Sequence, residues 1–177
     1  LDDGLSWPEL LARYDVLQVT WSGVELRRSP VPRPWDLTPL MDLPVPLGQV
    51  VALPAVTDAV LWAKLDSPLT LTGIATTALF KPPILWLTVW TQEGRELRFR
   101  VVPGLARGGF VLSPLVQDCV SFGLLASEGG LRELNAHRVA ALRLSADTGT
   151  GLTSSYESSA RLQLFRLAYP GQDLGVV

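Results

Sequence analysis

The stretch at residues 84–102, ILWLTVWTQEGRELRFRVV, decides the fold of this chain. Aromatic and β-branched residues, which are enriched in strands, occur on both sides of Glu93-Gly94. Two such runs around a short turn signal are typical of a β-hairpin. The stretch therefore predicts two antiparallel strands joined by a tight turn.

The pairing of this hairpin follows from its turn. If Glu93-Gly94 forms the turn, Trp86 and Trp90 lie on a uniformly apolar face, which favours a place in the core for both indoles. Arg98 and Arg100 then lie on the opposite, mixed face, at the rim of the sheet or under a neighbouring element.

Further strand signals occur on both sides of this hairpin, at a spacing that suits a β-sandwich. We therefore predict a mainly all-β fold: a single domain over residues 1–177, a jelly-roll-like β-sandwich with one or two short helices. The predicted strands, besides the two in the hairpin, are 15–21 and 24–27, which form a first hairpin, and 49–53, 58–66, 69–74, 138–145 and 158–168.

Two short helices are expected. Ser6 and Glu9 have the spacing of a capping box, which predicts a helix over residues 7–13. Ser113-Pro114 predicts the start of a second helix that runs through residue 125, because proline is favoured at the first helical position.

Six prolines between residues 30 and 46 exclude a helix or a central strand there, so this segment is expected to run extended across the surface. It is interpreted as a connection that crosses between sheets. The alternative is a recognition segment that uses Arg27, Arg28 and Arg33 around the proline-rich core.

Composition argues against a nucleic-acid partner and against a membrane span within this sequence. Apolar residues make up 47% of the chain and charged residues 18%, with a net charge of −2, so we expect no nucleic-acid partner. The apolar stretch 69–90 has Lys81-Pro82-Pro83 at its middle, which predicts two apolar pieces rather than one membrane span. The chain starts at Leu1 and its single methionine is Met41, so we expect a domain excised from a longer chain.

Side chains that carry enzyme chemistry are scarce. The sequence has one histidine, His137, one cysteine, Cys119, and no cofactor fingerprint. One histidine and one cysteine cannot hold a transition metal without clustered carboxylates, which the sequence does not show. We expect no cofactor, no metal site and an inert thiol.

Two hydrolytic arrangements stay open as the alternative function. Asp147-Thr148-Gly149 matches the aspartic-protease signature, but no second copy occurs, so catalysis would need a symmetric dimer; the tripeptide is also a good turn sequence. A serine hydrolase would use His137 as its base, although no serine lies in a Gly-x-Ser-x-Gly elbow. The nucleophile would be Ser113, Ser121 or Ser127, with Asp118 or Asp147 as the orienting acid.

Tryptophan is abundant, with six residues, and sugar-binding jelly rolls stack pyranose rings on exposed aromatic side chains. Trp7, Trp21, Trp35 and Trp62 are possible platforms, and Trp35 is the first to test because it lies on the proline-rich segment. The candidate ligand-binding residues are Trp35, Trp62, Arg98 and Arg100.

Three segments have a recognisable pattern: ALFKPPILWL at 78–87, RFRVVPG at 98–104 and GFVLSPLV at 109–116. Together they resemble the soluble region of some multi-pass bacterial membrane proteins of the glycosyltransferase-like kind, over residues 47–167. The resemblance implies a domain on the extracytoplasmic (periplasmic) face of the bacterial inner membrane, tethered by spans outside this sequence. It supplies no functional residues.

The resulting hypothesis is a non-enzymatic extracytoplasmic accessory domain of a bacterial membrane protein. Its expected partner is a glycan, a lipid-linked sugar or another protein. A hydrolase that uses Asp147 or His137 is the competing function, and a purely structural module is a third possibility.

Overall fold

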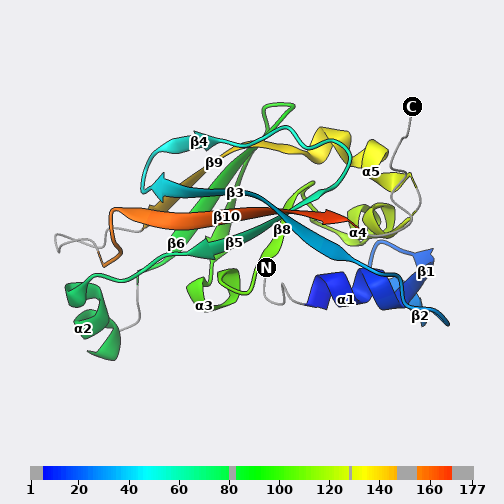
Figure 1. The fold of residues 1–177 in the computed structure, drawn as a ribbon, viewed down its shortest axis with the longest axis horizontal. Helices are drawn as coiled ribbons and strands as arrows, with labels where there is room; N and C mark the ends of the chain where they lie inside the picture. The colour runs from blue at the N-terminus through cyan, green and yellow to red at the C-terminus, as the bar shows by residue number, and fades with distance from the viewer. Residues whose placement is uncertain (1–5, 80–82, 128, 147–154, 169–177) are drawn as a thin grey trace.

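A computed structural model of the chain describes residues 6–79, 83–127, 129–146 and 155–168. In this part of the chain, eight strands form two four-stranded antiparallel sheets that lie face to face (Figure 1). The first sheet has the order β3 (Asp36–Pro46), β10 (Ser159–Ala168), β5 (Val60–Asp66) and β8 (Phe110–Ser113). The second has the order β4 (Val50–Ala52), β9 (Val139–Ala146), β6 (Leu85–Thr91) and β7 (Glu96–Val101).

The strand order is that of a jelly roll. In each sheet an early strand at the edge pairs with a late strand: β3 pairs with β10, and β4 pairs with β9. The chain therefore has the wrapped connectivity of a jelly roll. The prediction of a mainly β, sandwich-like fold is therefore confirmed.

Several short helices and one hairpin lie at one end of the sandwich, and a further short helix lies at the opposite end (Figure 1). Strands β1 (Tyr14–Val19) and β2 (Val24–Arg28) form the predicted first hairpin, directly after the predicted helix α1 (Ser6–Arg13). No helix in the described residues is long and apolar enough to span a bilayer. The other helices are α2 (Leu71–Leu79), α3 (Pro103–Ala106), α4 (Cys119–Ala126), α5 (Gly130–Glu133) and the 3₁₀ helix η1 (Leu134–His137).

Two apolar clusters stabilise the fold, and they share the first sheet. One fills the space between the sheets, where Leu61 of β5 and Leu144 of β9 are buried. The other lies on the outer face of the first sheet, where helices α1, α4 and α5 cover Val60 and Trp62 of β5. Burial of apolar side chains in both clusters is the main source of stability.

The hairpin at residues 84–102 forms as predicted, but its register differs by one residue. Val89 pairs with Leu97 and Leu87 with Phe99, because the turn contains three residues, Gln92 to Gly94, instead of two. A shift of one residue exchanges the two faces of a strand. Leu87 and Val89 are therefore in the core, and the prediction that Trp86 and Trp90 are core residues is wrong.

The predicted strand at 69–74 is wrong, because this segment begins helix α2. The Thr70 hydroxyl accepts a hydrogen bond from the Gly73 N–H at 3.0 Å, which caps the first turn. The hydroxyls of Thr76 and Thr77 then donate to carbonyls four residues earlier, so both hydroxyls are hydrogen-bonded within the helix. Helix α2 extends from the end of the sandwich away from α1 (Figure 1).

The second predicted helix exists but begins later than expected. Ser113 ends strand β8, a strand that the sequence analysis missed, and the Ser113-Pro114 bond is cis. Helix α4 instead has Asp118 as its N-cap, in a capping box with Ser121.

The proline-rich segment runs extended, as predicted, and its second half is strand β3. Among the described strands it lies at the edge of its sheet and pairs with β10 alone. Prolines such as Pro39 and Pro44 are tolerated there because an edge strand has no second neighbour that needs their missing N–H donors.

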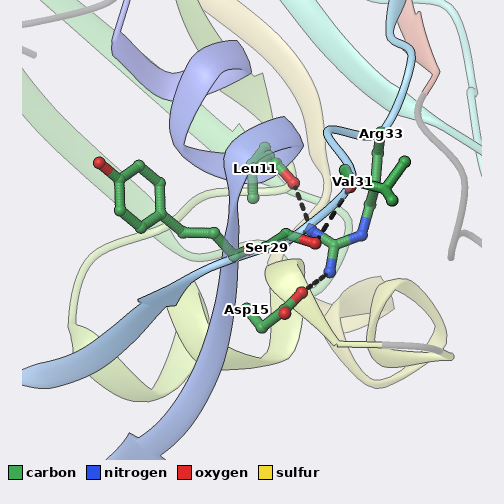
Figure 2. Close-up of polar contacts among 6 residues, drawn as sticks. Leu11, Asp15, Ser29, Val31 and Arg33 are labelled. Atoms are coloured by element: carbon green, nitrogen blue, oxygen red, sulfur yellow. Dashed lines mark hydrogen bonds and ion pairs between the residues drawn. The ribbon is translucent and has the colours of Figure 1, made fainter.

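Arg33 attaches the start of this segment to helix α1 (Figure 2). Its guanidinium donates to the carbonyls of Leu11 and Tyr14 at 3.0 Å and forms an ion pair with Asp15. Ser29 stabilises the same segment by donating its hydroxyl to the Val31 carbonyl at 3.1 Å. These contacts give Arg33 a structural role at the carboxyl end of the helix, where a cation is favoured.

Candidate functional site

The outer face of the second sheet carries an aromatic and basic cluster. We call this the Trp–Arg face and define it by Trp86 and Trp90 of β6, Arg98 and Arg100 of β7, and Arg143 of β9. These side chains share one face because they occupy alternating positions on three neighbouring strands. Both indoles are half-buried, and Arg98 and Arg100 are exposed.

Two guanidiniums stack on the two indoles. The Arg98 Cζ atom lies 4.2 Å from the centroid of the Trp86 ring, and the Arg143 Cζ atom lies 5.3 Å from that of Trp90. A guanidinium held over an indole by a cation–π contact can still donate hydrogen bonds from the N–H groups that point away from the ring. The Trp90 indole is fixed further by donating Nε1–H to Glu96 at 3.0 Å.

The three arginines of this face form no ion pair with a described residue. The ion pairs of the described residues involve other arginines, such as Arg33 with Asp15 and Arg161 with Asp42. Glu96 is the one acidic side chain among the residues paired across β6, β7 and β9 on this face. The face is therefore locally basic on a chain with a net charge of −2, and its chemistry suits carboxylates or phosphates.

The four residues predicted for ligand binding do not come together. Arg98 and Arg100 lie on the outer face of the second sheet, on β7, and Trp35 precedes β3 at the edge of the first sheet. The Trp35 side chain is 39% exposed, so its ring is accessible there.

Trp62 is not available as a platform, which corrects that candidate. Its side chain is 0% exposed and packs in the cluster beneath the helices. A β-carbon at Gly109 would lie 2.2 Å from its Nε1 atom, which shows how closely the chain covers the ring. Alternation on β5 points Trp62 away from the core between the sheets and toward the helices.

The remaining candidate platforms differ in exposure. Trp7 packs edge-on against Phe122, with ring centroids 5.3 Å apart, whereas Trp21 is 93% exposed in the β1–β2 turn. Neither lies on the Trp–Arg face.

The residues of the possible serine hydrolase have structural hydrogen bonds. Ser121 is buried and its hydroxyl donates to the Asp118 carboxylate at 2.8 Å, while Ser113 accepts from the Val139 N–H at 3.1 Å. Hydrogen bonds from the backbone N–H and the hydroxyl of Ser121 lower the pKa of Asp118. In the described part of the chain, the His137 side chain has no hydrogen bond to a serine or an acid.

The possible protease residue Asp147 lies outside the described residues. Among the residues that are described, no three histidine, cysteine, aspartate or glutamate side chains are grouped as a metal site would need.

Sequence reasoning missed Trp86, Trp90 and Arg143 as surface residues. The signal that could have found them is the spacing of Trp86 and Trp90, which are four residues apart and must share a face in any strand. Only the register of the turn decides whether that face is the core or the surface.

No protein-family model matches this chain, and comparison with curated proteins and with solved structures finds no similar protein. The resemblance to glycosyltransferase-like membrane proteins therefore stays a prediction.

Proposed function

We propose that this chain is a non-enzymatic accessory domain of a bacterial membrane protein, on the extracytoplasmic side, that binds an anionic glycan through the Trp–Arg face. One observation carries the proposal. Three arginines share one sheet face with two half-buried indoles, two of the guanidiniums lie over the indoles, and none of the three arginines has a carboxylate partner among the described residues.

The chemistry of the face favours an acidic saccharide over a neutral one. A guanidinium stacked on an indole keeps a planar edge of N–H donors, which matches a carboxylate or phosphate in a bidentate way. The exposed parts of the indoles offer apolar surface to the C–H faces of sugar rings. An acidic sugar satisfies both groups at once.

The spacing of the indoles favours an extended ligand. Trp86 and Trp90 are four residues apart on one strand, which corresponds to about 13 Å along β6. A ligand that contacts both rings is therefore an oligosaccharide or a lipid-linked sugar with its phosphate, rather than a single monosaccharide. The expected location rests on the resemblance of residues 47–167.

The proposal is tested by titrating the protein with an oligogalacturonate and with a neutral oligosaccharide of equal length, followed by tryptophan fluorescence. We expect a saturable change with the acidic ligand, and an affinity that falls with added salt because exposed charges are screened. The double variant Arg98→Gln/Arg100→Gln should bind at least about tenfold more weakly, since a hydrogen bond to a charged group contributes roughly 1.5–3 kcal/mol.

The matched control is Arg27→Gln/Arg28→Gln, which removes two exposed arginines from strand β2. If both double variants weakened binding equally, the loss of affinity would come from the change in net charge, which would contradict a site on β7. Binding that is lost in Trp35→Ala and retained in the Arg98/Arg100 variant would move the site to the β3 edge. Absence of binding to the acidic ligand would contradict the proposal itself.

A further inference from the structure

An apolar pocket lies between the two sheets at the side of the sandwich where both are open. Strand β7 is the edge of the second sheet and β8 the edge of the first, so neither has a further neighbour among the described strands on that side. The pocket has a volume of about 300 Å³. Ligand pockets in proteins occupy roughly 300–1,000 Å³, and packed interiors contain few voids larger than a water molecule. A hollow of this size is therefore large enough for a small ligand.

The lining of the pocket is almost entirely apolar. Leu87 and Val89 of β6 contribute from one sheet and Phe110 of β8 from the other, and all three are at most 5% exposed. Phe99 of β7 also lines the pocket. No charged side chain belongs to this lining among the residues that the structure describes, so the pocket is suited to a hydrocarbon group.

The lining of the pocket also includes a fixed aromatic wall and one polar group. Trp7 lines the pocket and is held by its edge-on contact with Phe122. A wall that is already ordered lowers the entropic cost of binding. Gln117 is the one polar residue among the described residues of the lining. It is exposed, and its side-chain amide makes no hydrogen bond with a described residue.

We propose that this pocket binds the single unbranched alkyl chain of an amphiphile, with an uncharged polar head at Gln117. At roughly 30 Å³ for each water-sized group, the volume accommodates a chain of about ten methylenes. The Gln117 amide both donates and accepts, which suits a hydroxyl head. Asp118 follows Gln117 directly in the chain, and like-charge repulsion from this acidic residue disfavours an anionic head.

This inference is separate from the glycan proposal, because Arg98 and Arg100 do not line the pocket. The test is calorimetric titration of the protein with decanol and, in parallel, with decanoate, both below their aggregation limits. We expect saturable binding of decanol and weaker binding of decanoate. Decanol brominated at its terminal carbon should quench the fluorescence of Trp7, and the Trp7→Phe variant should lose that part of the quenching.

The matched variants are Val116→Trp, which fills the pocket, and Val120→Trp, which adds the same ring at a position that is 55% exposed on α4 and outside the lining. Val116→Trp should lower the affinity for decanol at least about tenfold while Val120→Trp leaves it unchanged. Gln117→Leu, at an exposed position where folding is not at risk, should weaken decanol by several fold.

Because apolar binding can have an enthalpy near zero at about 25 °C, the proposal is overturned when decanol gives no heat of binding and the brominated decanol also fails to quench Trp7. Equal binding by the wild type, Val116→Trp and Gln117→Leu overturns it as well. Tighter binding of decanoate than of decanol overturns the assignment of an uncharged head. A glycan titration that fails while decanol binds would contradict only the proposed function.

Discussion

Asp118 determines the start of helix α4. Its carboxylate accepts hydrogen bonds from the backbone N–H of Ser121 at 2.7 Å and from the Ser121 hydroxyl at 2.8 Å, and these bonds lower its pKa. We predict that Asp118→Ala lowers the free energy of unfolding at neutral pH by about 1 kcal/mol, as for loss of other N-caps.

The contribution of the Asp118 charge has a defined pH dependence. Because the pKa is lower in the folded than in the unfolded state, the charge stabilises the protein above the ordinary aspartate pKa. This stabilisation is lost as the pH falls through the lowered folded value. Urea unfolding from pH 7 down to pH 3 should therefore show the gap between wild type and Asp118→Ala shrinking at the acid end. A gap that widens in acid would show that the charge does not stabilise the cap.

The hydrogen-bond partners of Arg138 could not be predicted from the sequence. The side chain is 1% exposed, and its guanidinium donates to the carbonyls of Val56, Thr57 and Ala59, about 80 residues earlier in the chain. Burial lowers the pKa of Arg138. Nothing next to it in the sequence indicates these acceptors, because the fold alone brings the two segments together.

Among the secondary-structure elements, the β6–β7 hairpin has its register set by Gly94. Its φ of +83° lies in the left-handed region that side chains with a β-carbon disfavour. We predict that Gly94→Ala lowers the free energy of unfolding by about 1–2 kcal/mol and that Gly94→Asn costs less, because asparagine tolerates this conformation. Chemical denaturation measures both.

Gly104 provides the matched control for this substitution. It lies in helix α3, and a β-carbon built there meets no atom within 4 Å. Gly104→Ala should therefore be neutral or stabilising by up to about 1 kcal/mol, since it only restricts the unfolded chain. A loss at Gly104 equal to that at Gly94 would mean that the left-handed turn is not the cause.

The same hairpin shows how far the sequence predicts elements. Its two strands follow from the alternation of apolar and polar residues and from a turn signal. A two-residue turn and a three-residue turn around Gly94 are, however, equally compatible with the sequence. That choice exchanged the core face with the Trp–Arg face, and with it the interpretation of Trp86 and Trp90. Helix α2 was missed for a similar reason, because its threonines are typical of strands and bond within the helix instead.

The architecture of the whole molecule was easier to predict than its surface. Many short apolar segments at regular spacing indicate a sandwich, and the order of the strands follows the wrapping of a jelly roll. The pocket at the β7–β8 side was not predictable, because its lining residues come from α1, β6, β7, β8 and the segment after β8. Apart from Trp7 and Gln117, these residues look like ordinary core residues in the sequence.

The two apolar clusters should unfold as one unit, because successive residues of β5 point into each in turn. Val60 belongs to the cluster under the helices and Leu61 to the cluster between the sheets, so neither cluster can open without disturbing the strand that both share. We predict one transition in urea, with coincident curves from tryptophan fluorescence and far-ultraviolet circular dichroism.

A matched pair of valines tests this cooperativity, since both are 0% exposed and lie on strands: Val60 in the outer cluster and Val89 between the sheets. Val60→Ala and Val89→Ala should each lower the free energy of unfolding by about 2 kcal/mol and shift the whole transition without splitting it. If Val60→Ala instead produced an early fluorescence change while the circular dichroism transition kept its midpoint, the helical layer would be a separate unit. The chain would then contain two cooperative parts, and the single domain expected over residues 1–177 would be wrong.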